Sequence, residues 1–338
     1  MSSAPKSAQS TKKYRKITLD MVLASTSLTR SSKETADAYL QRVTHLHLQM
    51  KKIRVIEGLD QCTNLKVLYL YDNQIELIQN LGFSSILQYL YLHNNLIKEI
   101  PNLTLPNLKK LYLDDNEIQS VSGLTNCAVL EELHVARQRL PAYASLQFQR
   151  DSLNSISRSL QVLEISGNGI TLLSSFCVLY NLRKLYCQDN KVIDLAEIEM
   201  IVSLPRLEEA NFLGNPCCTQ FKYRDTAIGA SSDSFQILDE VPIPKHQQIA
   251  IRGLMEHRRK IGAMSRFQQA INGSSGGISG GVSGSGEPSQ MEYHDQYQGQ
   301  EQYQEQYQQG SQDNSQPQYY EAEPENSEEV ASNYELHK

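Results

Sequence analysis

The sequence predicts an α/β solenoid, in which one short structural unit is stacked on the next along the chain. Three observations lead to this fold class. A unit of about 22 residues recurs through the middle of the 338-residue chain. Each copy begins with leucines at alternating positions, as in a short strand with one buried face. Each copy is also too short to bury a core alone, whereas a stack of such copies buries a continuous one.

The repeated pattern is L-x-x-L-x-L-x-x-N-x-I. It is clearest in three successive segments, residues 65–75, 87–97 and 108–118. Copies begin at residues 43, 65, 87, 108, 130, 160, 182 and 207, which gives about eight repeats across residues 43–216. So many copies with the same fixed positions predict a leucine-rich repeat solenoid.

The fixed polar position is an asparagine, found where the chain leaves the strand. A side-chain amide at this place can bond backbone groups that the turn would otherwise bury without a partner. Gln138 replaces the asparagine in the fifth copy and Lys51 replaces it in the first. In the second half of each copy, apolar residues lie three apart, which favours a tight helical turn on the convex side.

The remaining segments are predicted from the need to cover the ends of the stack and from composition. Terminal repeats expose apolar faces and need caps. Residues 287–338 hold twelve acidic residues and one basic residue, and a chain of this composition buries too little to fold. The expected organisation is a disordered basic N-terminus (1–15), a helical N-terminal cap (16–42), the repeats (43–216), a C-terminal cap (217–243), a basic helix (244–267), and a disordered Gly/Ser linker with an acidic Gln/Tyr-rich tail (268–338).

The fifth copy is eight residues longer than the standard unit. The extra residues belong to segment 141–158. Insertions in solenoids leave the stack as loops on one face and often carry function. A functional loop and a tolerated surface loop are both open interpretations here.

Several classes of protein are not expected. The chain has no run of 18 apolar residues and no secretory h-region, so neither a membrane span nor a signal peptide is predicted. It has six cysteines without a C-x-x-C pair, no Gly-rich phosphate loop and no H-E-x-x-H. We therefore expect no enzyme activity, no cofactor and no metal site, and a reduced, cytoplasmic protein.

The candidate binding surface is the concave face, formed by strand residues that alternate with the buried leucines. Stacked tyrosines at one exposed position offer rigid contact area with a hydrogen-bonding tip, which suits protein recognition. Residues 41–244 hold 18 basic and 22 acidic residues, a balance that makes a nucleic-acid partner unlikely there. The predicted partner-binding residues are Tyr69, Tyr71, Tyr89, Tyr91, Tyr112, Asp114, Asp115, Glu132, His134, Glu164 and Tyr186.

The repeats resemble the 22-residue class found in phosphatase regulators and in cilia-associated proteins. Segment 131–141 with its insertion, Asn215-Pro216 and segment 222–225 are similar to leucine-rich repeat regulatory subunits of protein phosphatase 1. The resemblance covers roughly residues 16–262. It implies a cytoplasmic regulator that binds the catalytic subunit of protein phosphatase 1, with tubulin or other cytoskeletal and ciliary proteins as further partners, at the centrosome, microtubule organising centre, cilium or flagellum.

One departure from phosphatase regulators is the docking motif Arg/Lys-Val-x-Phe/Trp. The chain offers Lys66-Val-Leu-Tyr69, without Phe or Trp at the fourth place and inside the solenoid. Phosphatase binding would therefore use the concave face. Two alternatives stay open: an axonemal or ciliary assembly factor without a phosphatase role, and an RNA-splicing adaptor, since a similar capped solenoid occurs in a small nuclear ribonucleoprotein subunit.

Overall fold

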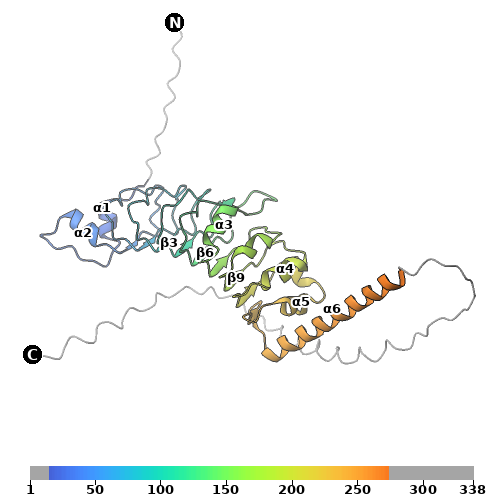
Figure 1. The fold of residues 1–338 in the computed structure, drawn as a ribbon. Helices are drawn as coiled ribbons and strands as arrows, with labels where there is room; N and C mark the ends of the chain where they lie inside the picture. The colour runs from blue at the N-terminus through green and yellow to red at the C-terminus, as the bar shows by residue number, and fades with distance from the viewer. Residues whose placement is uncertain (1–14, 274–338) are drawn as a thin grey trace, which may run out of the picture. The chain divides into compact units, whose positions relative to one another are not determined.

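The computed structural model describes residues 15–273, which form the stack and helices of Figure 1. Most of the predicted basic N-terminus and nearly all of the predicted linker and tail lie outside the described residues. None of the helices within 15–273 combines the length and the apolar character needed to cross a bilayer.

One ten-stranded sheet runs through the stack in chain order. Nine strands are parallel, and only the last pairs antiparallel with its neighbour. The strands are β1 (His45–His47), β2 (Val67–Tyr69), β3 (Tyr89–Tyr91), β4 (Lys110–Tyr112), β6 (Glu132–His134), β8 (Val162–Glu164), β9 (Lys184–Tyr186), β10 (Glu209–Asn211), β11 (Ile237–Leu238) and β12 (Val241–Pro242). The first eight correspond to the eight repeat copies, which confirms the predicted fold class.

The leucines of the pattern form the core. In β2, for example, Leu68 is fully buried, and so is Leu70 directly after the strand. Leu68 pairs in register with Leu46 on one side and with Leu90 on the other. Each fully buried leucine stabilises the fold by roughly 1.5–3 kcal/mol relative to an exposed one, so the stack is held by contacts between neighbouring copies.

The asparagines form a second row of contacts beside the leucines. The Asn116 side-chain amide donates to the carbonyls of Leu92 (3.0 Å) and Leu113 (2.8 Å), and its Oδ1 accepts from the Ile97 amide (3.0 Å). Gln138 makes the equivalent bonds in the fifth copy, including 2.9 Å to the Leu113 carbonyl. The longer amide therefore replaces asparagine without breaking the row.

The convex side differs from the predicted helical turns in the first four copies. Between residues 51 and 129 the convex segments contain turns and extended backbone but no helix. They form single tight turns, as in the 2.8 Å bond from the Cys62 amide to the Leu59 carbonyl, and they also bond to the preceding copy, as in the 2.9 Å bond from the Leu96 amide to the Ile75 carbonyl. Helices cover this side only later, in α3 (Arg150–Ile156), η1 (Ser174–Val178) and α4 (Leu195–Val202).

The insertion in the fifth copy contains regular structure. Its strand β7 (Gln147–Phe148) pairs in parallel with β5 (Ser120–Val121) of the preceding copy. Helix α3 follows directly, with Leu153 and Ile156 buried. The extra residues thus extend the hydrophobic core of the solenoid on its convex side.

The N-terminal end is covered by helices α1 (Leu19–Leu23) and α2 (Ala36–Arg42). Thr18 caps α1 by accepting from the Met21 amide (3.3 Å). Thr35 caps α2 by accepting from the Ala38 amide (3.2 Å). Tyr39 from α2 is fully buried against the first repeat.

The C-terminal end is covered by η2 (Pro216–Thr219), α5 (Tyr223–Ala230), β11 and β12, followed by α6 (Lys245–Gly273). Helix α6, orange in Figure 1, docks with its first turns. Gln248 is buried and bonds the Phe235 carbonyl (3.2 Å), and Arg252 donates to the Ser231 carbonyl (2.7 Å). Beyond these turns Arg258, Arg259 and Lys260 are exposed.

We predict that Asn116→Ala lowers the free energy of unfolding by about 2 kcal/mol or more, because each buried backbone group left without a partner costs about 1–3 kcal/mol. Urea unfolding of the full chain measures this change. Asn107→Ala is the matched control: Asn107 is exposed and donates one bond to the Ser85 carbonyl, so its loss is expected to cost under about 1 kcal/mol. Equal losses would contradict a structural role for the buried row.

Candidate protein-binding face

The concave face consists of the outward positions of the eight repeat strands, on both sides of the buried leucine. Because the strands pair without a shift in register, equivalent positions line up in columns across the sheet. The central column takes the last residue of each strand: His47, Tyr69, Tyr91, Tyr112, His134, Glu164, Tyr186 and Asn211. The sequence predicted this column, and the register of the sheet brings most of its aromatic members into contact.

Five rings of the central column form one continuous stack, here called the aromatic ladder: His47, Tyr69, Tyr91, Tyr112 and His134. Successive ring centroids lie 4.5, 4.8, 4.7 and 4.2 Å apart, with interplanar angles of 22° or less. These spacings follow from the distance of roughly 4.8 Å between paired strands. The ladder therefore forms a rigid, ordered surface across five repeats before any partner binds.

A second, shorter stack lies in the column two residues further along. Tyr71 stacks on His93 with centroids 4.5 Å apart and meets Tyr69 edge-on at 6.5 Å. The predicted partner-binding residues include Tyr71 but not His93. The matching offset in successive repeats was a signal for it, since in-register strands place equal offsets next to each other.

Ion pairs occupy the column on the other side of the ladder. Glu132 accepts from the Tyr112 hydroxyl (2.9 Å) and pairs with Lys110 (3.0 Å), while the Lys110 ammonium lies 5.8 Å from the Tyr89 ring centre. Tyr186 makes the equivalent bond to Glu209 (3.1 Å), but it is separated from the ladder because Glu164 lies between it and His134. Of the predicted tyrosines in the central column, Tyr186 alone stands apart.

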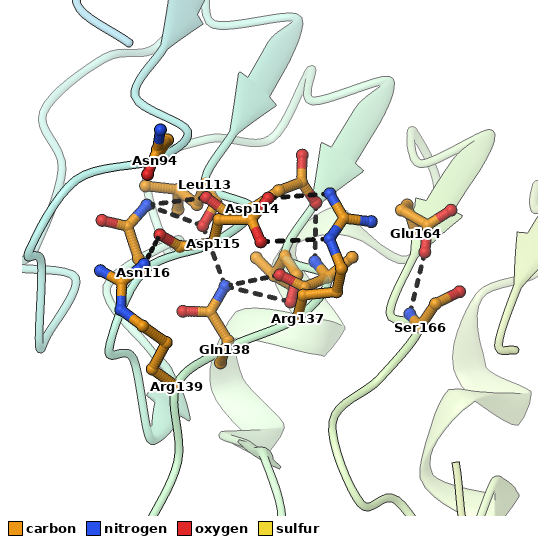
Figure 2. A network of polar contacts seen from close by, with 12 residues as sticks. Asn94, Leu113, Asp114, Asp115, Asn116, Arg137, Gln138, Arg139, Glu164 and Ser166 are labelled. Carbon is orange, nitrogen blue, oxygen red and sulfur yellow. Dashed lines mark hydrogen bonds and ion pairs between the residues drawn. The ribbon is translucent and has the colours of Figure 1, made fainter. Parts of the chain in front are cut away.

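The far end of the ladder is acidic. Figure 2 shows Asp114, Asp115 and Glu164 around Arg137. Asp115, in the turn after β4, forms an ion pair with Arg137 (2.8 Å), so it belongs to the edge of the concave face. Asp114 is 9% exposed and accepts from the Ala136 amide (2.7 Å). Glu164 accepts from the Ser166 amide (2.9 Å).

Burial sets the charge state of these groups. It raises the pKa of Asp114 to about 7, with a smaller contribution in the same direction from the negative charge of Glu164. It also raises the pKa of Glu164. Burial lowers the pKa of His134 to about 4 and raises that of Tyr91 to about 12. At neutral pH the His134 and Tyr91 rings are therefore uncharged, while a partly ionised carboxyl lies beside the end of the ladder.

Two histidine ring nitrogens on this face lack a hydrogen-bond partner within the described residues. They are Nδ1 of His93 and Nε2 of His134, both buried. Within residues 15–273 no group of three or more His, Cys, Asp or Glu residues has the arrangement to hold a metal ion. The chemistry available on the face is thus ring contact, hydrogen bonding and charge complementarity, all of which serve recognition of another molecule.

The repeats, the parallel sheet and the buried asparagine row define a leucine-rich repeat protein. The family model described as "Leucine Rich repeats (2 copies)" matches residues 87–138, which include most of the aromatic ladder. The chain therefore has a leucine-rich repeat fold.

Several solved structures are similar. Internalin C2 of Listeria monocytogenes has a TM-score of 0.47 and 23% identity, over 59% of this chain and 83% of that chain. Internalin InlF of the same organism has a TM-score of 0.46 and 21% identity, over 61% and 64% respectively. A leucine-rich repeat protein of Leptospira interrogans has a TM-score of 0.44 and 22% identity, over 63% and 58%.

We predict that the free energy of unfolding of the Asp114→Asn variant, relative to that of the wild type, increases as pH rises. The pKa of Asp114 is about 7 in the folded protein, against about 3.9 in an unfolded chain. Between these values the folded state holds a proton that the unfolded state has released, so wild-type stability falls as pH rises towards 7. The difference in free energy of unfolding should grow by roughly 1–3 kcal/mol between pH 5 and pH 8.

Urea unfolding of both proteins across this pH range measures the effect. Contributions from the histidines are shared by the two proteins and cancel in the difference. A difference that stays constant with pH would mean that Asp114 ionises in the folded state at its ordinary pKa.

Proposed function

We propose that this protein is a non-enzymatic scaffold that binds a partner protein on its concave face. The observation that carries the proposal is the aromatic ladder, in which five rings present contact area that is already ordered. Binding then loses little side-chain entropy, because the rings are held in place by stacking before the partner arrives. Tyrosine is also a residue that protein interfaces favour.

The proposed partner is the catalytic subunit of protein phosphatase 1. Support comes from the sequence resemblance to protein phosphatase 1 regulatory subunit 42, the testis leucine-rich repeat protein, which is most specific in segment 131–141. Two residues of that segment, Glu132 and His134, belong to the concave face. In this proposal the phosphatase would meet the ladder directly, since the Lys66-Val-Leu-Tyr69 segment contains the buried residues Val67 and Leu68 and cannot lie extended in another protein's groove.

The proposed place of action is the centrosome, the microtubule organising centre or the cilium. Helix α6 offers a feature that fits this location. Arg258 and Arg259 are exposed and have no ion-pair partner among the described residues, while Lys260 pairs with Glu256 (2.8 Å). Basic side chains on an exposed helix match acidic protein surfaces such as those of tubulin.

A second candidate function is an axonemal or ciliary assembly factor without a phosphatase role. The same ladder supports it equally, because stacked aromatic rings suit contact with a protein but do not specify which protein binds. The two candidates separate experimentally: the assembly factor would remain in salt-washed axonemes that lack the phosphatase catalytic subunit.

We predict that the full chain captures purified phosphatase 1 catalytic subunit at micromolar concentration, and that Tyr91→Ala with Tyr112→Ala weakens capture at least tenfold. Loss of two central rings removes contact area and the neighbours that order the ladder. Tyr91→Phe with Tyr112→Phe keeps the rings and tests the hydroxyl groups separately. A pull-down with quantified bound phosphatase measures all of these proteins.

Tyr180→Ala is the matched control, because Tyr180 is 58% exposed and lies outside the strands of the concave face. Urea unfolding verifies that each variant is folded at the temperature of the pull-down. Failure of the folded wild type to capture the phosphatase would reject this partner. Equal capture by the wild type and the alanine variant would place the phosphatase elsewhere on the molecule.

A further inference from the structure

A pocket of about 340 Å³ lies where the N-terminal cap meets the first repeat. Its walls come from two segments: residues 24–26, directly after α1, and alternate residues of the first repeat. The lining residues are Ala24, Ser25, Thr26, His47, Gln49 and Lys51. His47 is also the first ring of the aromatic ladder, so the pocket lies at the end of the ladder opposite to Asp114 and Glu164.

The pocket contains polar atoms that the fold itself does not satisfy. The Ser25 side chain is 6% exposed, and its hydroxyl has no hydrogen-bond partner within residues 15–273. Oε1 of Gln49 is also buried without a partner. By contrast, the Thr26 hydroxyl is engaged by the Tyr39 hydroxyl (2.6 Å) and the Leu28 amide (3.1 Å). Buried polar groups normally have partners, and each one left alone costs about 1–3 kcal/mol.

The charge around the pocket is positive. Lys51 brings an ammonium group, no acidic residue is among the lining residues, and no ion pair to Lys51 exists within the described part of the chain. The Ser25 hydroxyl can donate a hydrogen bond, and it moves between staggered positions by rotation about χ1. One charged donor and one hydroxyl donor therefore line the same space as the unpaired acceptor oxygen of Gln49.

We propose that this pocket binds the carboxylate of a glutamate or aspartate side chain from an extended segment of a protein partner. The ammonium of Lys51 neutralises the carboxylate, the Ser25 hydroxyl donates to one of its oxygens, and Oε1 of Gln49 accepts from a backbone N–H of the same segment. The rest of the segment continues along the aromatic ladder from His47. A single cation matches the single charge of a carboxylate better than the nearly double charge of a phosphoryl group, which usually meets several bases or an arginine.

This inference rests on the proposed function only in assuming that the partner is a protein. It predicts a property of the pocket alone, which can be measured without the phosphatase. The probe is the tripeptide acetyl-Gly-Glu-Gly-amide, and its neutral match is acetyl-Gly-Gln-Gly-amide. The protein is the full chain with labelled histidine rings, observed by NMR.

We predict that the glutamate tripeptide shifts the His47 ring signals with millimolar affinity, while the glutamine tripeptide leaves them unchanged. Burial lowers the pKa of the free His47 ring, and a carboxylate bound nearby favours the protonated ring. The titration midpoint of His47 should therefore move to higher pH at saturating glutamate tripeptide. The His134 ring, at the other end of the ladder, should not move.

Lys51→Gln and Ser25→Ala should each weaken binding at least fivefold. Lys52→Gln is the matched control, since Lys52 is the next residue, is exposed and does not line the pocket; it should bind like the wild type. Unchanged His134 signals would show that each variant is folded.

Three outcomes would overturn the proposal. Equal shifts with the glutamine tripeptide would mean that charge plays no part. Tighter binding of inorganic phosphate than of the glutamate tripeptide would assign the pocket to phosphoryl groups. No shift with any probe would mean that the pocket holds water only. A failed phosphatase pull-down would leave the tripeptide result intact, and the reverse also holds, so the two failures are distinguishable.

Discussion

The contact on which the rest of the structure depends is the amide row that joins each repeat to its neighbours. Asn116 bonds backbone groups of its own copy and of the preceding one. Such a residue fixes the shift between copies at zero, because any other register would leave buried carbonyls and amides without partners. The leucines supply most of the stabilising burial, but apolar contacts alone tolerate small displacements that directional hydrogen bonds do not. The row therefore selects one stacking geometry.

The concave face inherits its geometry from that constraint. Rings at equal offsets stack with centroids 4.2–4.8 Å apart because the strands beneath them are in register. The same alignment brings Asp114 near Glu164 and buries it, so that its pKa rises by the combined effect of burial and like charge. The arrangement of the rings and the charge states of the neighbouring carboxyl groups thus follow from the in-register stacking of the core.

The repeat architecture and the central column were predictable from sequence because both depend on period and offset. The fixed spacing between leucines defines the repeat. A residue position that recurs in each copy forms one column of the sheet. His93 was missed because a single histidine carries no signal until its neighbour Tyr71 is considered in the same column. The spacing of apolar residues predicted convex helical turns but not which copies would carry a full helix. The pairing of β7 with β5 could not be predicted, since it joins two segments with no shared pattern. The pocket beside Ser25 depends on how a cap with no repeat packs against the first copy, which no periodicity describes.

Taken along its length, the aromatic ladder has opposite chemistry at its two ends. Lys51 and the unpartnered Ser25 hydroxyl lie at one end, and carboxyl groups with raised pKa values lie at the other, with neutral rings between them. A partner segment with an acidic residue at one end and a basic residue at the other would match both ends in only one direction. Reversed, it would place like charges together at both ends, which is a cost that aromatic contact alone does not impose. The rings can therefore supply contact area while the ends determine the orientation in which a partner binds.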